Sequence, residues 1–215
     1  MPIKAVIFDM DGVLLDSMPM HLKIWEELFK ERKLPFNLEI FEEYNGMSSI
    51  DISKRLVEKF SLKEKPEKIF AEKLSKEKLM QEDMLNLFPE TISVLKKLRR
   101  DNIKVAIATS ALEHMVIYVK KRFGLDKHVD VFVESKDVKR TKPNPDVFLL
   151  AAKKLGVDPK DCIVVEDAVN GIIAANKAGM TSIAITTTFK SNVFKGKSDF
   201  IIKNLSQIQG IIGDD

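Results

Sequence analysis

The sequence predicts an α/β fold: a doubly wound, mainly parallel sheet with an inserted all-helical domain. Two observations carry this prediction. Short, continuous apolar runs recur along the chain, as in strands buried on both faces of a parallel sheet. Helical patterns alternate with these runs after about residue 86, as in strand–helix–strand units with right-handed crossovers.

The expected strands are short and rich in branched apolar residues. The first run, Ala5-Val6-Ile7-Phe8, has no polar alternation, and Phe200-Ile201-Ile202 is expected at a sheet edge. In order, the expected strands are 5–8, 105–108, 131–133, 163–165, 183–185 and 200–202.

The expected helices of the sheet domain have start or stop signals. Pro89 and Glu90 begin the first, and Gly179 follows the last. The predicted ranges are 89–101, 111–123, 145–155 and 168–178.

The block between the first two strands carries only helical patterns, and it is too long for a plain crossover. Its three expected helices contain Leu22 to Phe29, Ile52 to Phe60, and Ile69 to Leu79. We therefore expect a core of residues 1–16 and 86–215, with residues 17–85 as an inserted helical domain.

The composition limits the partners and the cellular compartment that we expect for this protein. The chain has 215 residues, 45% of them apolar, and a net charge of +3 without a dense basic block. We expect no nucleic-acid partner, and no membrane span because no apolar stretch approaches about 18 residues. The single cysteine, Cys162, excludes an intrachain disulfide and, with Asp9 so near the start, suggests a cytoplasmic protein. A monomer or weak homodimer is expected.

Four polar clusters each fall at the carboxyl end of an expected strand. Because ligands bind at the carboxyl ends of parallel strands, these distant residues should share one site. The clusters are Asp9-Met10-Asp11-Gly12, Thr109-Ser110, Lys142-Pro143-Asn144-Pro145-Asp146 and Glu166-Asp167.

Each cluster alone has a plain structural explanation: an acidic loop, a helix N-cap or a surface lysine. Together they supply what phosphoryl transfer needs. Asp9 and Asp11 would repel without a divalent cation, and Mg²⁺ prefers oxygen ligands. A carboxylate can attack phosphorus, hydroxyl and amide groups can hold phosphate, and Lys142 can neutralise charge.

The four clusters, in this order, resemble the phosphatase and phosphomutase branch of the haloacid dehalogenase superfamily, which has a Rossmann-like core. The resemblance implies that Asp9 is the nucleophile and a Mg²⁺ ligand, and that Asp11 is the general acid/base with its carbonyl on the metal. It also implies metal ligation by Asp167 with acidic Glu166 nearby, charge neutralisation by Lys142, and phosphate binding by Thr109 and Ser110.

The same resemblance makes the inserted domain a cap that closes over the site and selects a small phosphorylated metabolite. His21 and Trp25 resemble positions on the first cap helix of β-phosphoglucomutase, although a lone histidine on an amphipathic helix is usually a surface residue and Trp25 is expected chiefly to pack. Ser49 falls where that mutase has an arginine suited to a second phosphate, which favours a hydrolase.

We therefore expect a Mg²⁺-dependent phosphatase of sugar phosphates or similar phosphomonoesters. A sugar-phosphate mutase is the first alternative, and a phospho-accepting receiver domain is the second. Asp11 argues against the dehalogenase and phosphonate-cleaving branches, which lack this aspartate.

Overall fold

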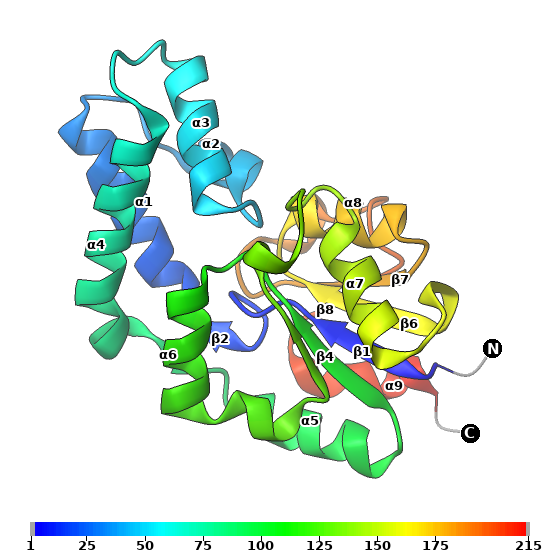
Figure 1. Ribbon diagram of the computed structural model, residues 1–215. Coiled ribbons are helices and arrows are strands. Elements are labelled where there is room, and N and C mark those ends of the chain that lie inside the picture. Colours follow the sequence, from blue (N-terminus) through cyan, green and yellow to red (C-terminus); the bar gives the residue numbers. More distant parts are fainter. Residues whose placement is uncertain (1–2, 214–215) are drawn as a thin grey trace.

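The computed structural model describes residues 3–213, and its core is a six-stranded parallel sheet (Figure 1). The strands are β1 (Ala5–Phe8), β4 (Lys104–Ala108), β5 (Val131–Val133), β6 (Cys162–Glu166), β7 (Thr181–Ile185) and β8 (Phe200–Ile202). Their spatial order is β5-β4-β1-β6-β7-β8, with every neighbouring pair parallel. The predicted fold class is confirmed, and β8 lies at the edge as expected.

Helices cover both faces of the sheet, which explains the uninterrupted apolar strands. Val6 and Phe8 of β1 pack into the apolar cluster that holds Leu95 of α5, whereas Ile7 packs on the other face with Phe148 of α7. The helices of this domain are α5 (Thr91–Arg100), α6 (Glu113–Phe123), α7 (Asp146–Leu155), α8 (Val169–Lys177) and α9 (Gln209–Ile212). Short 3₁₀ helices span Leu125–His128, Ser135–Asp137, Pro159–Asp161, Ser191–Val193 and Leu205–Ile208.

Between β1 and β4 the chain forms four further helices, and we call residues 17–85 the insert. They are α1 (Met18–Glu31), α2 (Leu38–Tyr44), α3 (Ser49–Lys59) and α4 (Pro66–Met84). Helix α2 was not predicted, because seven residues give little periodicity; its one local signal is Asn37, whose side chain accepts a hydrogen bond from the Ile40 amide at 2.9 Å. A two-stranded antiparallel ribbon, β2 (Leu15–Asp16) with β3 (Asn86–Leu87), joins the insert to the core.

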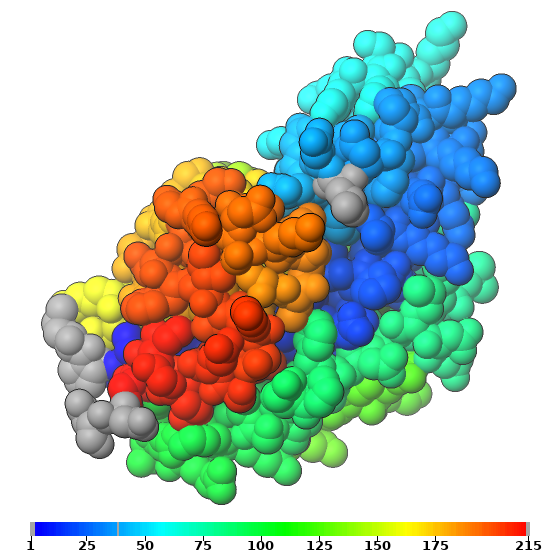
Figure 2. All heavy atoms as spheres, turned by 180° about the vertical axis from the view of Figure 1, so that it is seen from behind, coloured from blue at the N-terminus to red at the C-terminus, as the bar shows by residue number. Residues whose placement is uncertain are grey.

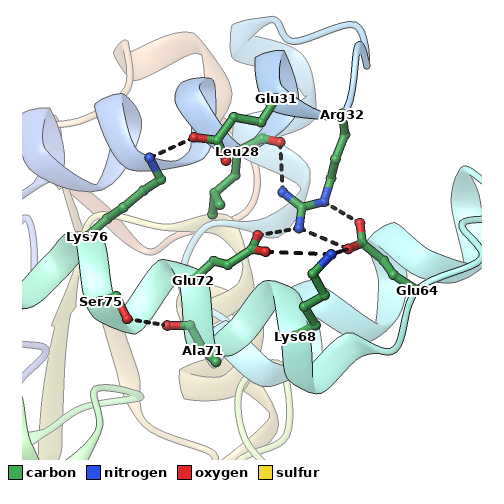
Figure 3. A network of polar contacts seen from close by, with 9 residues as sticks. All are labelled: Leu28, Glu31, Arg32, Glu64, Lys68, Ala71, Glu72, Ser75 and Lys76. Atoms are coloured by element: carbon green, nitrogen blue, oxygen red, sulfur yellow. Dashed lines mark hydrogen bonds and ion pairs between the residues drawn. The ribbon is translucent and has the colours of Figure 1, made fainter.

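The insert has its own internal contacts. The ring of Phe29 meets Phe36 and Phe60 edge to face, with centroids 5.1 Å and 5.9 Å apart. Figure 3 shows a polar network between α1 and α4, in which the Arg32 guanidinium binds the carboxylates of Glu64 and Glu72. Because the Arg32 side chain is only 10% exposed, this network is less screened by water than a surface ion pair.

The insert also touches the core. Figure 2 shows the insert, blue to cyan, lying against the orange segment of the core. Asn170 of α8 donates hydrogen bonds to the carbonyls of Glu43 (3.0 Å) and Asn45 (2.9 Å), and the ring of Phe41 lies 6.1 Å from that of Phe189. The insert therefore lies over the carboxyl ends of the strands (Figure 1). Within residues 3–213, no helix combines the length and apolarity that crossing a membrane requires.

Candidate active site

The register of the sheet brings three of the predicted clusters together. Phe8 pairs with Ile107 on one side and Val165 on the other, so the next residue, Asp9, lies beside Ala108 and Glu166. The Asp9 amide continues this ladder by donating to the Val165 carbonyl at 3.0 Å. Asp9, Thr109 and Glu166 meet because β1 lies between β4 and β6.

Lys142 is buried behind Asp9, with its side chain 0% exposed. Its Nζ donates to Asp9 Oδ1 (2.5 Å), Glu166 Oε1 (2.6 Å) and the Ala108 carbonyl (3.3 Å). Burial opposes the charged form, but the carboxylates of Asp9 and Glu166 outweigh it and raise the pKa of Lys142. The ammonium is therefore a permanent cation that fixes the orientation of the Asp9 carboxylate.

Asp9, Glu166 and Asp167 form a buried acidic cluster in which one oxygen of each lies within 4.8 Å of the others. Burial, opposed by Lys142, raises the pKa of Asp9 to about 7. Burial and the neighbouring carboxylates also raise the pKa of Asp167. Three buried carboxylates facing one ammonium have an excess of negative charge, and hard oxygen donors suit Mg²⁺. The residues therefore fit a magnesium ion.

Gly12 and Gly171 allow this crowding. A Cβ on Gly12, whose φ is +72°, would lie 2.0 Å from Asp167 Oδ2, and one on Gly171 would lie 1.9 Å from Glu166 Oε1. Both oxygens of Glu166 already have partners, since Oε2 accepts from the Ala168 amide at 3.0 Å and Oε1 from Lys142.

Asp11 lies in a different environment from Asp9. Ser17 Oγ donates to Asp11 Oδ1 at 2.6 Å, and His21 Nε2 lies 3.4 Å from the same oxygen. Burial opposes ionisation, but the hydrogen bonds from His21 and Ser17 outweigh it and lower the pKa of Asp11. Two carboxyl groups two residues apart thus have pKa values shifted in opposite directions.

The loop after β4 holds the two predicted phosphate-binding residues. Thr109 is buried, and its hydroxyl accepts from the Ala111 amide at 2.9 Å. Ser110 Oγ donates to the carbonyl of Gly46 in the insert at 2.9 Å. Helix α6 begins at Glu113, two residues later than predicted, so this loop is longer than expected.

A cavity of about 80 Å³ lies between the strand ends and the insert, and we call it the Asp9 cavity. Seven of the predicted site residues line it: Asp9, Asp11, His21, Ser49, Thr109, Ser110 and Asp167. Lys142 and Glu166 are not lining residues and lie behind Asp9. Trp25, predicted chiefly as a packing residue, is buried and also lines the cavity.

Sequence reasoning missed several residues near this cavity. Lys73 of α4 pairs with Glu77 Oε2, and Glu77 Oε1 lies 2.9 Å from His114 Nε2 on α6. Burial lowers the pKa of Lys73 to about 8. In the sequence, Lys73 and Glu77 look like any solvated pair on a charged helix, so no local signal was available. Thr188, which donates to Asp167 Oδ2, follows β7 and could have been found by the strand-end rule.

A buried aspartate held by a lysine, beside acidic residues at the carboxyl edge of a parallel sheet, offers the groups that a carboxylate nucleophile and a metal site require. The chain belongs to the haloacid dehalogenase-like hydrolase family, whose model matches residues 3–179. The resemblance seen in the motifs is thereby confirmed, and the protein is an enzyme rather than a receiver domain.

The relatives with assigned activities include both phosphatases and a mutase. The chain is 32% identical over 181 residues to a fructose-1-phosphate phosphatase of Escherichia coli, covering 84% of this chain and 95% of the relative. It is also 32% identical over 192 residues to a β-phosphoglucomutase of Bacillus subtilis, covering 85% and 83%. A crystal structure of a hydrolase from Pseudomonas syringae superposes with a TM-score of 0.86 at 25% identity, covering 97% of each chain.

Proposed function

We propose that the protein is a Mg²⁺-dependent phosphatase that hydrolyses small phosphomonoesters, such as sugar phosphates, through an aspartyl-phosphate on Asp9. One observation carries the proposal. Asp9 lines the cavity while Lys142 Nζ donates to its Oδ1 at 2.5 Å, which leaves its second oxygen without a bond to that lysine. A fixed carboxylate at the floor of a cavity is a nucleophile held in one direction.

In the first step, a carboxylate oxygen of Asp9 forms a bond to phosphorus and the ester oxygen leaves as an alcohol. In the second step, water attacks the aspartyl-phosphate, which releases inorganic phosphate and restores the carboxylate. Thr109 and the Ser110 amide bind phosphate oxygens in this proposal, because both residues line the cavity, and the ammonium of Lys142 offsets the charge near Asp9.

In this proposal, Asp11 carries the proton in both steps. Its lowered pKa makes it a carboxylate before substrate binds, which suits the base that takes a proton from water. The entering phosphate adds negative charge nearby and raises the proton affinity of Asp11, which suits the acid that protonates the leaving alcohol. His21 orients Asp11 through their shared hydrogen bond.

Asp9, Asp167 and the Asp11 carbonyl would hold the magnesium ion, while Glu166 chiefly orients Lys142, because both of its oxygens already have partners. When bound, Mg²⁺ supplies positive charge that offsets the charge of the phosphoryl group. We also propose that residues 17–85 act as a cap domain, on the evidence of the contacts that join the insert to the core over the cavity.

The test is a panel of phosphomonoesters assayed with Mg²⁺ and with a chelator, scored for inorganic phosphate and for isomerised product. Phosphate release that needs Mg²⁺ is expected. A phosphoryl group that survives acid quenching and is removed by hydroxylamine is also expected on Asp9. Isomer without phosphate would instead favour a sugar-phosphate mutase, the alternative that the β-phosphoglucomutase relative supports. Against the mutase, no arginine occurs among the described residues that line the cavity.

A further inference from the structure

The loop that follows β7 reaches the acidic cluster, and the role inferred for it rests on the magnesium site of the proposed function. The hydroxyl of Thr188 donates a hydrogen bond to Asp167 Oδ2. The two residues are 21 positions apart, so the contact is tertiary and does not come from a local turn. Asp167 is buried and lines the Asp9 cavity, whereas Thr188 is not one of the described lining residues. Thr188 therefore binds the carboxylate from behind the cavity, much as Lys142 binds Asp9.

The two oxygens of the Asp167 carboxylate lie in different surroundings. Oδ2 accepts from Thr188 and is so close to Gly12 that a Cβ there would lie 2.0 Å from it. Oδ1 accepts no hydrogen bond from the described residues, and it is not one of their fully buried atoms without a partner. One oxygen is thus held by the protein, while the other is left for the cavity that Asp167 lines.

The position of Thr188 is set by its neighbours on both sides. The hydroxyl of Thr187 donates to the carbonyl of Gly12 in the loop after β1. The ring of Phe189 lies 6.1 Å from that of Phe41 in the insert. Since these contacts hold the loop against both the core and the insert, the Thr188 hydroxyl is directed at the carboxylate by contacts other than its own.

A hydrogen-bond donor behind a metal-binding carboxylate has a known physical effect. It fixes the orientation of the carboxylate before the cation arrives, and the loss of such a donor typically weakens metal binding. A hydrogen bond that served only to stabilise the fold would contribute equally with and without the cation. The two roles therefore differ in whether the affinity for Mg²⁺ changes when the hydroxyl is removed.

We propose that Thr188 is a positioning residue for the magnesium ion. Its hydroxyl holds Asp167 Oδ2 and thereby keeps Oδ1 directed to the cavity, where the cation would bind.

A Mg²⁺ titration of chelator-stripped protein without substrate, followed by the rise in unfolding temperature, gives the Kd of the cation. Thr188→Val keeps the size of the side chain but removes the hydroxyl, and it should raise this Kd by about 10- to 100-fold. Thr188→Ser restores a hydroxyl and should bind Mg²⁺ within about threefold of the parent. In phosphate release, Thr188→Val should need more Mg²⁺ but recover a kcat within about threefold of the parent once Mg²⁺ is saturating.

Thr186→Val is the matched control, because it removes a hydroxyl from the same loop that donates to the Ile202 carbonyl at 3.2 Å, and its Kd should equal that of the parent. Thr188→Ala replaces Thr188→Val if circular dichroism shows that valine disturbs the fold. A parental Kd without the hydroxyl, or a Thr188→Ser variant as weak as Thr188→Val, would overturn this inference and leave the proposed phosphatase standing. A parent whose unfolding temperature does not respond to Mg²⁺ would overturn the magnesium site and the proposed function with it.

Discussion

The floor and the wall of the Asp9 cavity are built in different ways. The floor consists of side chains at strand ends, where sheet register and the buried Lys142 determine their positions. The wall is carried largely by helices of the insert, which meet the core through a few hydrogen bonds such as those of Asn170. If the proposed function holds, this difference predicts that substitutions at the floor change the chemical step, whereas substitutions at the wall change substrate selection.

Removing the nucleophile should have the largest effect. We expect Asp9→Asn to lower kcat by at least about 10⁴-fold, because the amide cannot attack phosphorus. Without metal, the midpoint temperature of thermal unfolding should be no lower than that of the parent, because the change removes one of three buried carboxylates. Phosphate-release kinetics and circular dichroism measure both quantities. Activity within about tenfold of the parent would remove Asp9 from the mechanism.

Lys142→Met should be the most damaging change to stability at the floor. It leaves Asp9 and Glu166 buried without their cation, so the free energy of unfolding should fall by about 3–5 kcal/mol. Lys190→Met, at an exposed position, is the control and should change it by less than about 0.5 kcal/mol. Denaturant titration decides the result, and equal effects in the two variants would show that Lys142 has no structural role.

The raised pKa of Asp9 predicts that the free energy of unfolding depends on pH through this residue of the cavity floor. Because burial raises this pKa from 3.8 to about 7 in the folded protein, the folded state holds a proton that the unfolded state has released. With a chelator present, the stabilisation from this proton is complete below pH 3.8 and is lost as pH rises to about 7. As pH rises over this range, the free energy of unfolding of the parent should therefore fall relative to that of Asp9→Asn.

Added Mg²⁺ should reduce that pH dependence, because it stabilises the carboxylate form of the cluster. Unfolding curves of both proteins at several pH values, with chelator and with Mg²⁺, provide the measurement. A parent that gains stability relative to Asp9→Asn as pH rises in chelator would contradict the assigned direction.

The smallest effect is expected at the wall. Asn170→Ala removes the two hydrogen bonds to the carbonyls of Glu43 and Asn45 but leaves the floor intact. We expect kcat/KM to fall by about three- to tenfold, because the insert is held less firmly over the cavity. Asn192→Ala serves as the control, because Asn192 is exposed and does not line the cavity. A loss as large as that of Asp9→Asn would show that wall and floor are not separable.

Most of the fold and the floor could be predicted from the sequence. The run from Ala5 to Phe8 predicts a doubly buried strand, and the strand-end rule placed Asp9, Thr109 and Glu166 at one edge before any register was known. Helix α2 and the buried pair of Lys73 and Glu77 could not be found in this way. Their positions depend on packing between segments far apart in the chain, which local periodicity does not record.

The sequence by itself therefore determined the order of most strands and helices, the helical block between the first two strands and the residue types of the candidate site, because these depend on periodicity and on chemical groups in fixed order. Only the tertiary structure decided that Lys142 lies behind Asp9 rather than in the cavity, that Glu166 binds Lys142, and that Lys73 pairs with Glu77 beside the cavity. Those facts depend on which side chains from distant segments meet in the folded chain, because burial and pairing are set by contacts that no single segment contains.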